Sequence, residues 1–305
     1  MARTEQAIML PSERTASRVA IRRVAGYDAD LRAVITETLR EFSLPIQGKT
    51  ILLKPNLVSS DPGGAVATHA AVIGAAKEAF LRLGAAKVLV GEGPALERDT
   101  EMILESAGLR EQIGPLAENF IDLNLDEAHK VRLRTRASRL SELYFPQSVL
   151  RADYIVSMPK LKTHHWAGVT LSLKNMFGIV PGCCYGWPKN VLHWAGIGQS
   201  ILDINSTIRP DFAIVDGIIG MEGNGPVQGN SKTSGVLVLG DDPVAVDATC
   251  CRIMKLRPEK VDYLRKAAHL LGHIQEGRIC QLGESIQQVQ TPFEVIKDFE
   301  YLRAR

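Results

Sequence analysis

The chain has 305 residues, a formal net charge of +2, 45% apolar residues and 23% charged residues. These proportions are typical of a globular protein with one large or two small domains. The near-neutral charge and the lack of a long Lys/Arg run argue against a nucleic-acid partner. No apolar run approaches the ~20 residues of a membrane span, and the N-terminus lacks the apolar core of a secretory signal. We therefore expect a cytoplasmic protein without a membrane partner.

We expect residues 1–16 to form a flexible leader and residues 17–305 a single α/β domain, with any boundary between two lobes in residues 124–150. Apolar runs typical of strands alternate with segments of helical periodicity. The expected strands are residues 17–24, 50–54, 87–91, 120–123, 154–156, 212–216, 234–239 and 293–299. The expected helices are residues 28–42, 69–83 with Thr68 as N-cap, 99–107, 191–208, a helix capped by Asp242, and 261–271. The alternation predicts a mostly parallel sheet with flanking helices, which can form two lobes around a central cleft.

Polar side chains stand directly after four of the expected strands, namely Lys54, Glu92, Lys160 and Asp216. In open α/β sheets the carboxyl ends of the strands form the edge at which ligands bind. Asn56 follows Lys54 closely, and His69 begins the next helix, so both would face the same edge. A plain surface position is an equally good interpretation of His69.

Residues 153–194 hold the densest group of candidate functional side chains. A buried strand runs into Pro159, which we expect to stop regular structure. The polar residues that follow are Lys160, Lys162, His164, His165, Lys174, Asn175 and His193, with apolar and small residues between them. No Asp or Glu lies between the first and the last of them, whereas solvated segments normally mix both signs. The pattern predicts an electropositive, partly dry pocket for a small anion, and a basic surface loop is the alternative.

A second candidate loop is expected over residues 217–231, where Glu222 and Asn224 lie among glycines and Pro226. Such a composition lets the backbone approach a ligand closely. The Asn-Gly pair is also a common turn signal, so a plain hairpin turn is the alternative. The arginines of residues 124–141 are expected to form the solvated face of an edge hairpin.

The five cysteines have neither a CxxC motif nor the spacing of a ferredoxin, so we expect no iron–sulfur cluster. Cys250 and Cys251 fall in a helical pattern and are expected to be buried thiols. Cys183 and Cys184 follow a Pro-Gly turn beside the basic stretch. They are candidate ligands or nucleophiles, with buried thiols again as the plainer interpretation.

The first functional hypothesis is an enzyme that moves protons on a small carboxylate or phosphate, as a racemase, epimerase or other isomerase does. Two of the lysines, Lys160 and Lys162, would hold the anion. The acid and the base would come from His164 or His165 together with His69 or His193. Lys174 would be an electrostatic anchor, a Schiff-base nucleophile or a cofactor tether, since burial among cations lowers the pKa of an amine. Further substrate contacts are expected from Lys54, Asn56, His165, Asn175, Glu222 and Asn224.

Two other hypotheses use the same residues differently. His164, His193 and Glu222 could form a two-His-one-carboxylate site for iron or zinc. Alternatively, the protein could be a non-enzymatic anion-binding or redox-partner module, although the missing cluster cysteines argue against the redox version. A homo-oligomer is compatible with the sequence, which does not determine the oligomeric state.

Several motifs together resemble domain-of-unknown-function family 362. They are Lys54-Pro55-Asn56, Thr68-His69, Val90-Gly91-Glu92-Gly93, Pro159-Lys160-Leu161-Lys162-Thr163-His164, Leu173-Lys174-Asn175-Met176-Phe177-Gly178, Met221-Glu222-Gly223-Asn224-Gly225-Pro226 and Asp242-Pro243-Val244-Ala245-Val246-Asp247. The resemblance runs from about residue 50 to residue 270. Many members of that family also carry a ferredoxin-like segment, which this chain lacks.

A fainter resemblance is to the lactate racemase family, on the order and spacing of His164, Lys174 and His193. In that family the corresponding lysine carries a covalently attached nickel-pincer cofactor, so the resemblance implies that Lys174 is the attachment site and nickel the metal. The substrate loop of the racemases is replaced here by Asp61-Pro62-Gly63-Gly64, which is a departure from their pattern.

Overall fold

The computed structural model describes residues 16–59, 64–94 and 99–304, to which every structural statement refers. The expected leader and most of the loop at Asp61 lie outside these residues. Ten strands form one sheet: β1 (Ser17–Arg23), β2 (Thr50–Pro55), β3 (Lys87–Glu92), β4 (Phe120–Asp122), β7 (Tyr154–Met158), β8 (Lys160–His164), β9 (Gly168–Thr170), β10 (Phe212–Glu222), β11 (Asn230–Gly240) and β12 (Ile279–Gly283). A separate hairpin consists of β5 (Ala128–Arg132) and β6 (Glu142–Pro146).

The helices lie between or after the strands along the chain, singly or in groups. They are α1 (Leu31–Phe42), α2 (Ala70–Arg82), α3 (Thr100–Ser106), α4 (Leu109–Ile113), α5 (Leu116–Asn119), α6 (Gln147–Arg151), α7 (Ser172–Asn175), α8 (Gly182–Tyr185), α9 (Asn190–Trp194), α10 (Ile197–Thr207), α11 (Pro243–Ile253), α12 (Asp262–Ala267) and α13 (Ile286–Val289). Short 3-10 helices occupy η3 (Met176–Ile179), η4 (Pro258–Lys260), η5 (Glu276–Arg278) and η6 (Lys297–Leu302). None of the helices in the described residues is long and apolar enough to cross a bilayer.

The sheet has the order β12-β1-β11-β10-β7-β2-β3-β4, with β8 beside β10 and β9 beside β8. Pairing is parallel from β10 through β7, β2 and β3 to β4, and also between β10 and β8 and between β1 and β12. Only the pairs β1/β11, β10/β11 and β8/β9 of this sheet are antiparallel. The expected α/β fold with a mostly parallel sheet is confirmed.

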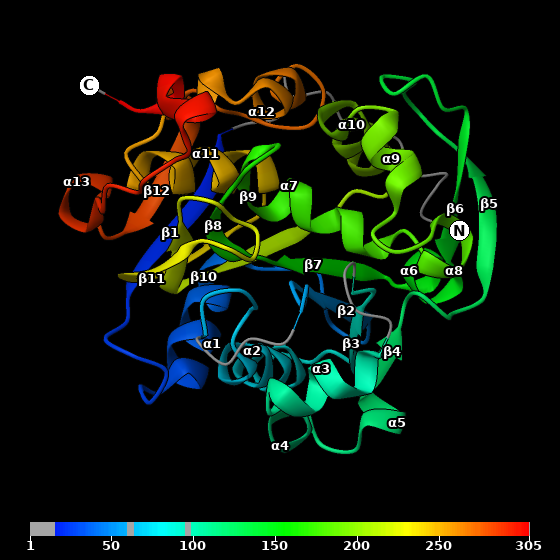
Figure 1. The fold of residues 1–305 in the computed structure, drawn as a ribbon. Coiled ribbons are helices and arrows are strands. Elements are labelled where there is room, and N and C mark those ends of the chain that lie inside the picture. The colour runs from blue at the N-terminus through cyan, green and yellow to red at the C-terminus, as the bar shows by residue number, and fades with distance from the viewer. Residues whose placement is uncertain (1–15, 60–63, 95–98, 305) are drawn as a thin grey trace.

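Helices cover both faces of the sheet, α1 to α5 on one side and α9 to α12 on the other (Figure 1). The central strands are therefore apolar on both faces. In β2, Ile51 and Leu53 belong to the core beneath α1 and α2, whereas Leu52 between them belongs to the core beneath α11 and α12. This two-sided burial explains the near-continuous apolar runs in the sequence. The parallel strands bring their carboxyl ends, with Lys54 and Glu92, to one edge.

β7 ends at Met158 and β8 begins at Lys160, so the expected stop of regular structure is confined to Pro159 itself. Its carbonyl accepts a hydrogen bond from the backbone N–H of Asp216 at 2.9 Å, and β8 begins at the next residue. Lys160 and Lys162 are then in register with Asp216 and Met221 of β10. Pairing with a neighbouring strand thus outweighs the local break at proline, and it buries the first part of the basic stretch.

Other boundaries also differ from the sequence prediction. The helix expected over residues 191–208 is divided into α9 and α10 at Gly196, whose φ of 99° is outside the helical region. The loop expected over residues 217–231 is confined to residues 223–229, because β10 and β11 are paired as far as Glu222 and Asn230. Residues 293–299 make only one bridge, between Val295 and Gly223, and β12 is the edge strand instead.

The N-cap of α2 is His69 and not Thr68. The His69 ring accepts a hydrogen bond from the Ala71 N–H. The Thr68 hydroxyl instead accepts from the Asn56 N–H and donates to the carbonyl of Met158. It therefore ties the end of β2 to the end of β7.

Candidate functional site

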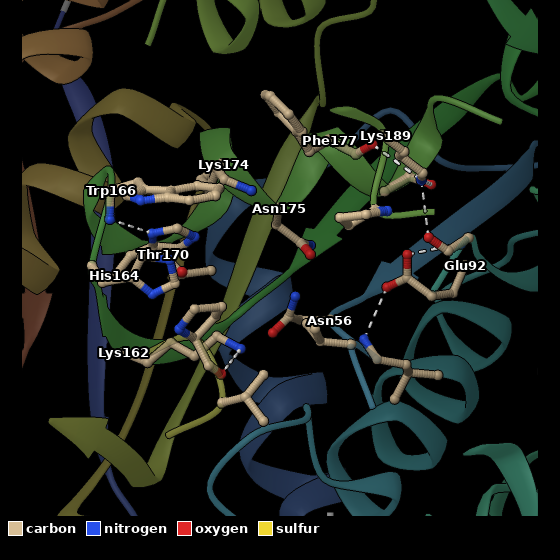
Figure 2. Close-up of a pocket in the computed structure, with 18 of the residues that line it drawn as sticks. Asn56, Glu92, Lys162, His164, Trp166, Thr170, Lys174, Asn175, Phe177 and Lys189 are labelled. Carbon is tan, nitrogen blue, oxygen red and sulfur yellow. Dashed lines mark hydrogen bonds between the residues drawn. The ribbon is translucent and has the colours of Figure 1, made fainter. Parts of the chain in front are cut away.

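A cavity of about 370 Å³ lies at the carboxyl ends of β2, β3 and β8. It is lined by nine of the twelve residues proposed from the sequence, and these are Lys54, Asn56, Lys162, His164, His165, Lys174, Asn175, His193 and Asn224. Figure 2 shows His164 and Lys162 at one end and Glu92 and Lys189 at the other, with Lys174 and Asn175 between them. The acid-free stretch is therefore a cavity wall and not a solvated surface loop.

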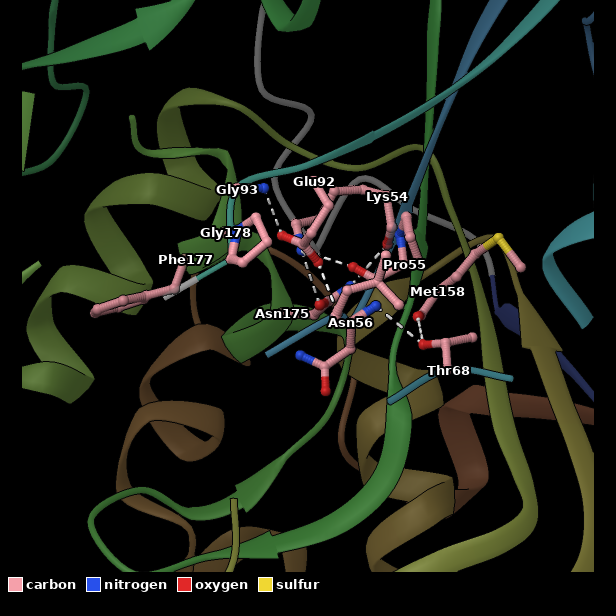
Figure 3. A network of polar contacts seen from close by, with 12 residues as sticks. Lys54, Pro55, Asn56, Thr68, Glu92, Gly93, Met158, Asn175, Phe177 and Gly178 are labelled. Atoms are coloured by element: carbon pink, nitrogen blue, oxygen red, sulfur yellow. Dashed lines mark hydrogen bonds and ion pairs between the residues drawn. The ribbon is translucent and has the colours of Figure 1, made fainter. Parts of the chain in front are cut away.

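Lys54 and Glu92 form a buried ion pair at one end of the cavity (Figure 3). The Lys54 Nζ atom lies 2.6 Å from the Glu92 carboxylate and 3.1 Å from Oδ1 of Asn175. The same carboxylate accepts hydrogen bonds from the backbone N–H groups of Leu57 and Gly93. Because these donors satisfy the charge of Glu92, it leaves no anionic group to neutralise the other lysines of the cavity.

The close approach of this network requires a glycine at position 178. A Cβ atom there would lie 2.3 Å from Oε1 of Glu92 and 2.4 Å from Nζ of Lys54. Both distances are far shorter than a van der Waals contact. Gly178 thus lets η3 pack directly on the ion pair.

Lys174 is the cation that projects into the cavity without a hydrogen-bond or ion-pair partner among the described residues. Its ammonium lies 4.2 Å from the centre of the Phe177 ring. Burial and the nearby charge of Lys54 lower the pKa of Lys174 to about 8. Lys162, at the histidine end, donates instead to the carbonyl oxygens of Val66 and Pro226.

Asp247 binds the N-terminus of α7, the short helix that carries Lys174. The carboxylate of Asp247 accepts hydrogen bonds from the N–H groups of Ser172, at 2.7 Å, and Leu173, at 3.1 Å. It therefore satisfies two donors of the first turn, as an N-cap does. Burial raises the pKa of Asp247 to about 7.

Lys189 is a fourth lysine of the cavity, and the sequence analysis did not select it. Its side chain is buried, and its Nζ atom lies 3.0 Å from the Gly93 carbonyl, with the Phe177 and Gly178 carbonyls at 3.5 and 3.4 Å. Burial lowers its pKa to about 7. The signal was present in the sequence, because Lys189 follows a Gly-Trp-Pro turn within the acid-free stretch.

His164 has a ring orientation that is set by the backbone. Its Nδ1 atom accepts hydrogen bonds from the N–H groups of Trp166, at 3.0 Å, and Ala167, at 3.2 Å. An atom that accepts from two donors cannot carry a proton, so the neutral ring has its proton on Nε2. Burial, reinforced by the charge of Lys174, holds the pKa of His164 well below the usual value. This ring is therefore a fixed N–H donor.

His165 and His193 have the opposite tautomer. The Nδ1 atom of His165 lies 2.6 Å from the Gly225 carbonyl, and that of His193 lies 3.2 Å from the Lys189 carbonyl. A carbonyl only accepts, so Nδ1 donates and Nε2 is left with a lone pair. Burial and the charge of Lys174 lower the pKa of His193. Both rings can therefore accept a proton, which His164 in its present state cannot do at Nδ1.

Two buried polar atoms of the cavity wall have no hydrogen-bond partner among the described residues. They are Oδ1 of Asn56 and Oγ1 of Thr170. Buried polar groups of a native protein are normally satisfied, and exceptions often mark a position where a ligand or water binds. Thr170 was not selected from the sequence, since a single threonine in an apolar strand carries no distinguishing pattern.

Lys160 and His69 are not part of the cavity wall, and the structure corrects their expected placement. Lys160 is completely buried and pairs with Asp216 at 3.0 Å, with the Tyr27 hydroxyl at 2.8 Å. His69 stacks on the Tyr27 ring with a centroid distance of 3.7 Å. Both side chains therefore belong to a cluster around Tyr27 and Asp216. Lys160 reaches it because β8 pairs with β10, and His69 reaches it from the N-terminus of α2.

The expected metal site is also corrected. His164 and His193 line the cavity, but Glu222 lies outside it, where its carboxylate pairs with Lys232 at 3.2 Å and accepts the Glu294 N–H. Across residues 16–59, 64–94 and 99–304, no three His, Cys, Asp or Glu side chains are grouped as metal ligands. The cause is again β10, which extends through Glu222 as a strand.

The cysteines have two distinct environments. Cys250 and Cys251 are buried in α11 as expected. Cys183 and Cys184 are exposed on α8, with their sulfur atoms 3.8 Å apart, and are not buried thiols. Neither lines the cavity.

The arginine-rich segment forms the hairpin β5/β6, which is separate from the main sheet and not at its edge. Arg132, Arg136 and Arg139 are exposed, as expected of a solvated face.

Comparison with known proteins finds similarity to a curated protein and to several solved structures, two of which are described. The thylakoid-associated protein sll1697 of Synechocystis sp. is 30% identical over 225 residues, which are 70% of this chain and 65% of that protein. The chain thus spans slightly less than two thirds of the curated relative it matches. The lactate racemase apoprotein from Thermoanaerobacterium thermosaccharolyticum aligns with a TM-score of 0.42 at 13% identity, over 71% of this chain and 54% of that one. A protein from Thermotoga maritima aligns with the same TM-score and identity, over 72% and 57%.

A family model supports the first resemblance seen in the sequence. The model described as Domain of unknown function (DUF362) matches residues 51–252. The matched segment includes β2, β3, β8 and α7, and hence most of the residues that line the cavity. On this match over well more than half of its length, the chain belongs to the family of the domain of unknown function DUF362.

Proposed function

We propose that the protein is an enzyme that binds a small carboxylate or phosphate in the cavity and moves a proton on it. Lys174 holds the anion, and His193 accepts the proton at Nε2. His164 donates a hydrogen bond from Nε2–H to an oxygen on which charge develops. These roles follow from the free ammonium and from the opposite tautomers of the two rings.

The observation that carries this proposal is the charge balance of the cavity wall. Lys54, Lys162, Lys174 and Lys189 line it, and Glu92 is the one carboxylate among the lining residues. Glu92 is paired with Lys54, so the ammonium of Lys174 remains without a counter-charge. A cation in an apolar cavity is costly unless an anion joins it, so anion binding there is favourable.

The unpartnered atoms of the wall add a second recognition element. Oδ1 of Asn56 only accepts hydrogen bonds, so it fits a hydroxyl or N–H group of the ligand. Oγ1 of Thr170 can donate or accept. The bound molecule would therefore combine an anionic group with at least one hydrogen-bond donor.

Anion binding is tested by calorimetric titration with inorganic phosphate, acetate and glycolate at constant ionic strength. Lys174→Gln should weaken binding at least about tenfold, since a hydrogen bond to a charged group contributes ~1.5–3 kcal/mol. Lys266→Gln removes the same charge at an exposed site on α12 and should change affinity less than about twofold. Equal effects of the two substitutions would refute a specific anion site at Lys174.

Proton transfer is tested by incubating the protein with 2-hydroxy acids and amino acids in D₂O. Loss of the Cα–H signal in proton NMR reports abstraction of that proton. His193→Gln should abolish the exchange of any acid that the wild type exchanges, because glutamine has no basic nitrogen. Anion binding without exchange on any carboxylate of the panel would contradict the enzymatic part of the proposal and leave an anion-binding module.

A second candidate function is covalent chemistry at Lys174, and its partnerless amine with a pKa of about 8 favours it. An amine with a lowered pKa is partly neutral at pH 7 and hence nucleophilic. The same atom is where a lysine-attached cofactor would be held. Intact-mass measurement and elemental analysis of protein from its native host test this: an added mass on Lys174 supports it, and an unmodified, metal-free protein that borohydride does not trap with carbonyl compounds rejects it.

A further inference from the structure

The cavity is larger than an anionic group requires. A carboxylate or phosphate occupies about the space of three or four water molecules, ~100 Å³ at about 30 Å³ each. The cavity of about 370 Å³ falls within the range of pockets that enclose ligands of drug-like size. Most of its space is therefore available to the part of the ligand beyond the anion.

One side of the cavity is a continuous wall of aromatic rings. The ring of His164 lies 5.0 Å from that of His165, which lies 4.8 Å from Trp166. Trp166 lies 5.2 Å from His193, and His193 lies 5.6 Å from Phe177. The wall ends at Phe177, directly below the ammonium of Lys174. A ligand anchored at Lys174 would thus extend along these rings.

Trp166 is the exposed member of the wall. Its side chain lines the cavity, yet 60% of the residue is accessible to solvent. Its backbone N–H holds Nδ1 of His164, so its position follows from that hydrogen bond and from the ring contacts on either side. The Trp166 indole is thus a large apolar ring in a fixed position at the solvent-exposed side of a cavity with polar groups in its wall. Such a ring is suited to packing on the apolar part of a ligand.

We infer that the ligand is an anion with an attached flat apolar group, such as an aryl or arylalkyl carboxylate or phosphate, and that this group packs on Trp166. The inference rests on the proposed function, since it assumes that the anion sits at Lys174. The anionic group of the ligand contacts Lys174, and its apolar group packs on the indole of Trp166. Bringing the two surfaces together removes both from water.

The experiment compares ligands with and without an aryl group by calorimetry at constant ionic strength. Acetate is compared with phenylacetate, and methyl phosphate with phenyl phosphate. In at least one pair, the aryl member should bind about tenfold more tightly, as expected when a ring of this size is buried. The pair that shows the gain identifies the anionic group as carboxylate or phosphate.

Trp166→Ala should remove most of this gain and leave the affinity for acetate or methyl phosphate within about twofold, because it keeps the backbone N–H that orients His164. Trp194→Ala is the matched control: Trp194 is 81% exposed on α9 and does not line the cavity. It should change neither affinity. Trp166→Phe, which keeps a flat ring, should retain part of the gain.

The outcomes separate this inference from the proposed function. Equal affinities within both pairs, or equal losses in Trp166→Ala and Trp194→Ala, overturn the inference while anion binding at Lys174 stands. Binding of aryl anions that Lys174→Gln does not weaken refutes the anion site, and with it the placement inferred here. An aryl gain that depends on both Trp166 and Lys174 supports the two together.

Discussion

The backbone carbonyl of Lys189 lies 3.2 Å from Nδ1 of His193, and the side chain of the same lysine is buried against three other carbonyl oxygens. Lys189 has a φ of 65°, in the left-handed region that most residues avoid. Its ammonium therefore holds a strained backbone position from which the carbonyl can reach His193. Lys189 thus contacts the buried end of the cavity with its ammonium and fixes the tautomer of His193 with its carbonyl.

Replacement of Lys189 should weaken the preference of His193 for the tautomer that has its proton on Nδ1. Lys189→Asn keeps a residue that tolerates positive φ but removes the ammonium. We expect the preference of His193 for the Nδ1–H form to fall about five- to tenfold, which corresponds to one net hydrogen bond of about 1 kcal/mol. Nitrogen-15 NMR of the imidazole measures this ratio directly. Lys255→Asn is the control, since Lys255 has a φ of 59° but an exposed side chain; an unchanged His193 in Lys189→Asn would show that Lys189 does not position it.

The pH dependence of turnover should have two limbs. His193 must be neutral to accept a proton, and its pKa is lowered by burial, so activity should fall only as the pH drops below about 6.5. Lys174 must be charged to hold the anion, and its pKa is about 8, so activity should fall as the pH rises through about 8. The profile of kcat/KM reports both limbs for the free enzyme. Lys174→Gln should lower the plateau and remove the alkaline limb, and survival of that limb would assign it to another group.

Removal of the buried carboxylate at Glu92 should be strongly destabilising. Glu92→Gln keeps the shape but leaves the ammonium of Lys54 buried without a charged partner, which costs ~3–5 kcal/mol of the free energy of unfolding. Glu142→Gln breaks an ion pair with Lys130 at 2.8 Å on the exposed hairpin and should cost far less, because water screens an exposed pair. Urea denaturation compares the two. Similar losses would mean that the buried pair does not organise the cavity.

Asp247 should fix the position of Lys174 without contacting the ligand. Asp247→Ala leaves the buried N–H groups of Ser172 and Leu173 without acceptors, and each such loss costs ~1–3 kcal/mol. We expect anion affinity to fall about tenfold as α7 shifts, and Asp247→Asn to recover part of both losses through its remaining oxygen. Asp262→Ala, on the exposed face of α12, should change stability by less than ~1 kcal/mol. Normal anion affinity in folded Asp247→Ala would exclude this positioning role.

The sequence was informative where local chemistry and fold topology agree. Lys54 and Glu92 end apolar runs that are typical of buried parallel strands, and such strands bring their carboxyl ends together. The lack of acidic residues from Lys160 to His193 likewise predicted a pocket, because a charged surface normally carries both signs, and the residues from Lys162 onward do contribute to the cavity wall. For these residues, the type and order along the chain were enough to predict that they meet.

Other features depended on partners distant in sequence. Lys160 and Lys162 are alike in composition and two residues apart, yet one pairs with Asp216 inside the sheet and the other lines the cavity, because β8 pairs with β10. Glu222 lies outside the cavity because β10 continues as a strand, paired with β11, as far as this residue.

The sequence by itself therefore determined the α/β class, the edge of the sheet at which the site lies and the positive charge of that site. Only the tertiary structure decided which lysine has a counter-ion and which nitrogen of each histidine carries the proton. Those properties depend on single carbonyl, amide and carboxylate groups, such as those of Lys189, Ala167 and Asp216, that long-range strand pairing and loop packing bring within 3 Å or so of the side chain. Local patterns of residues do not encode distances of that kind.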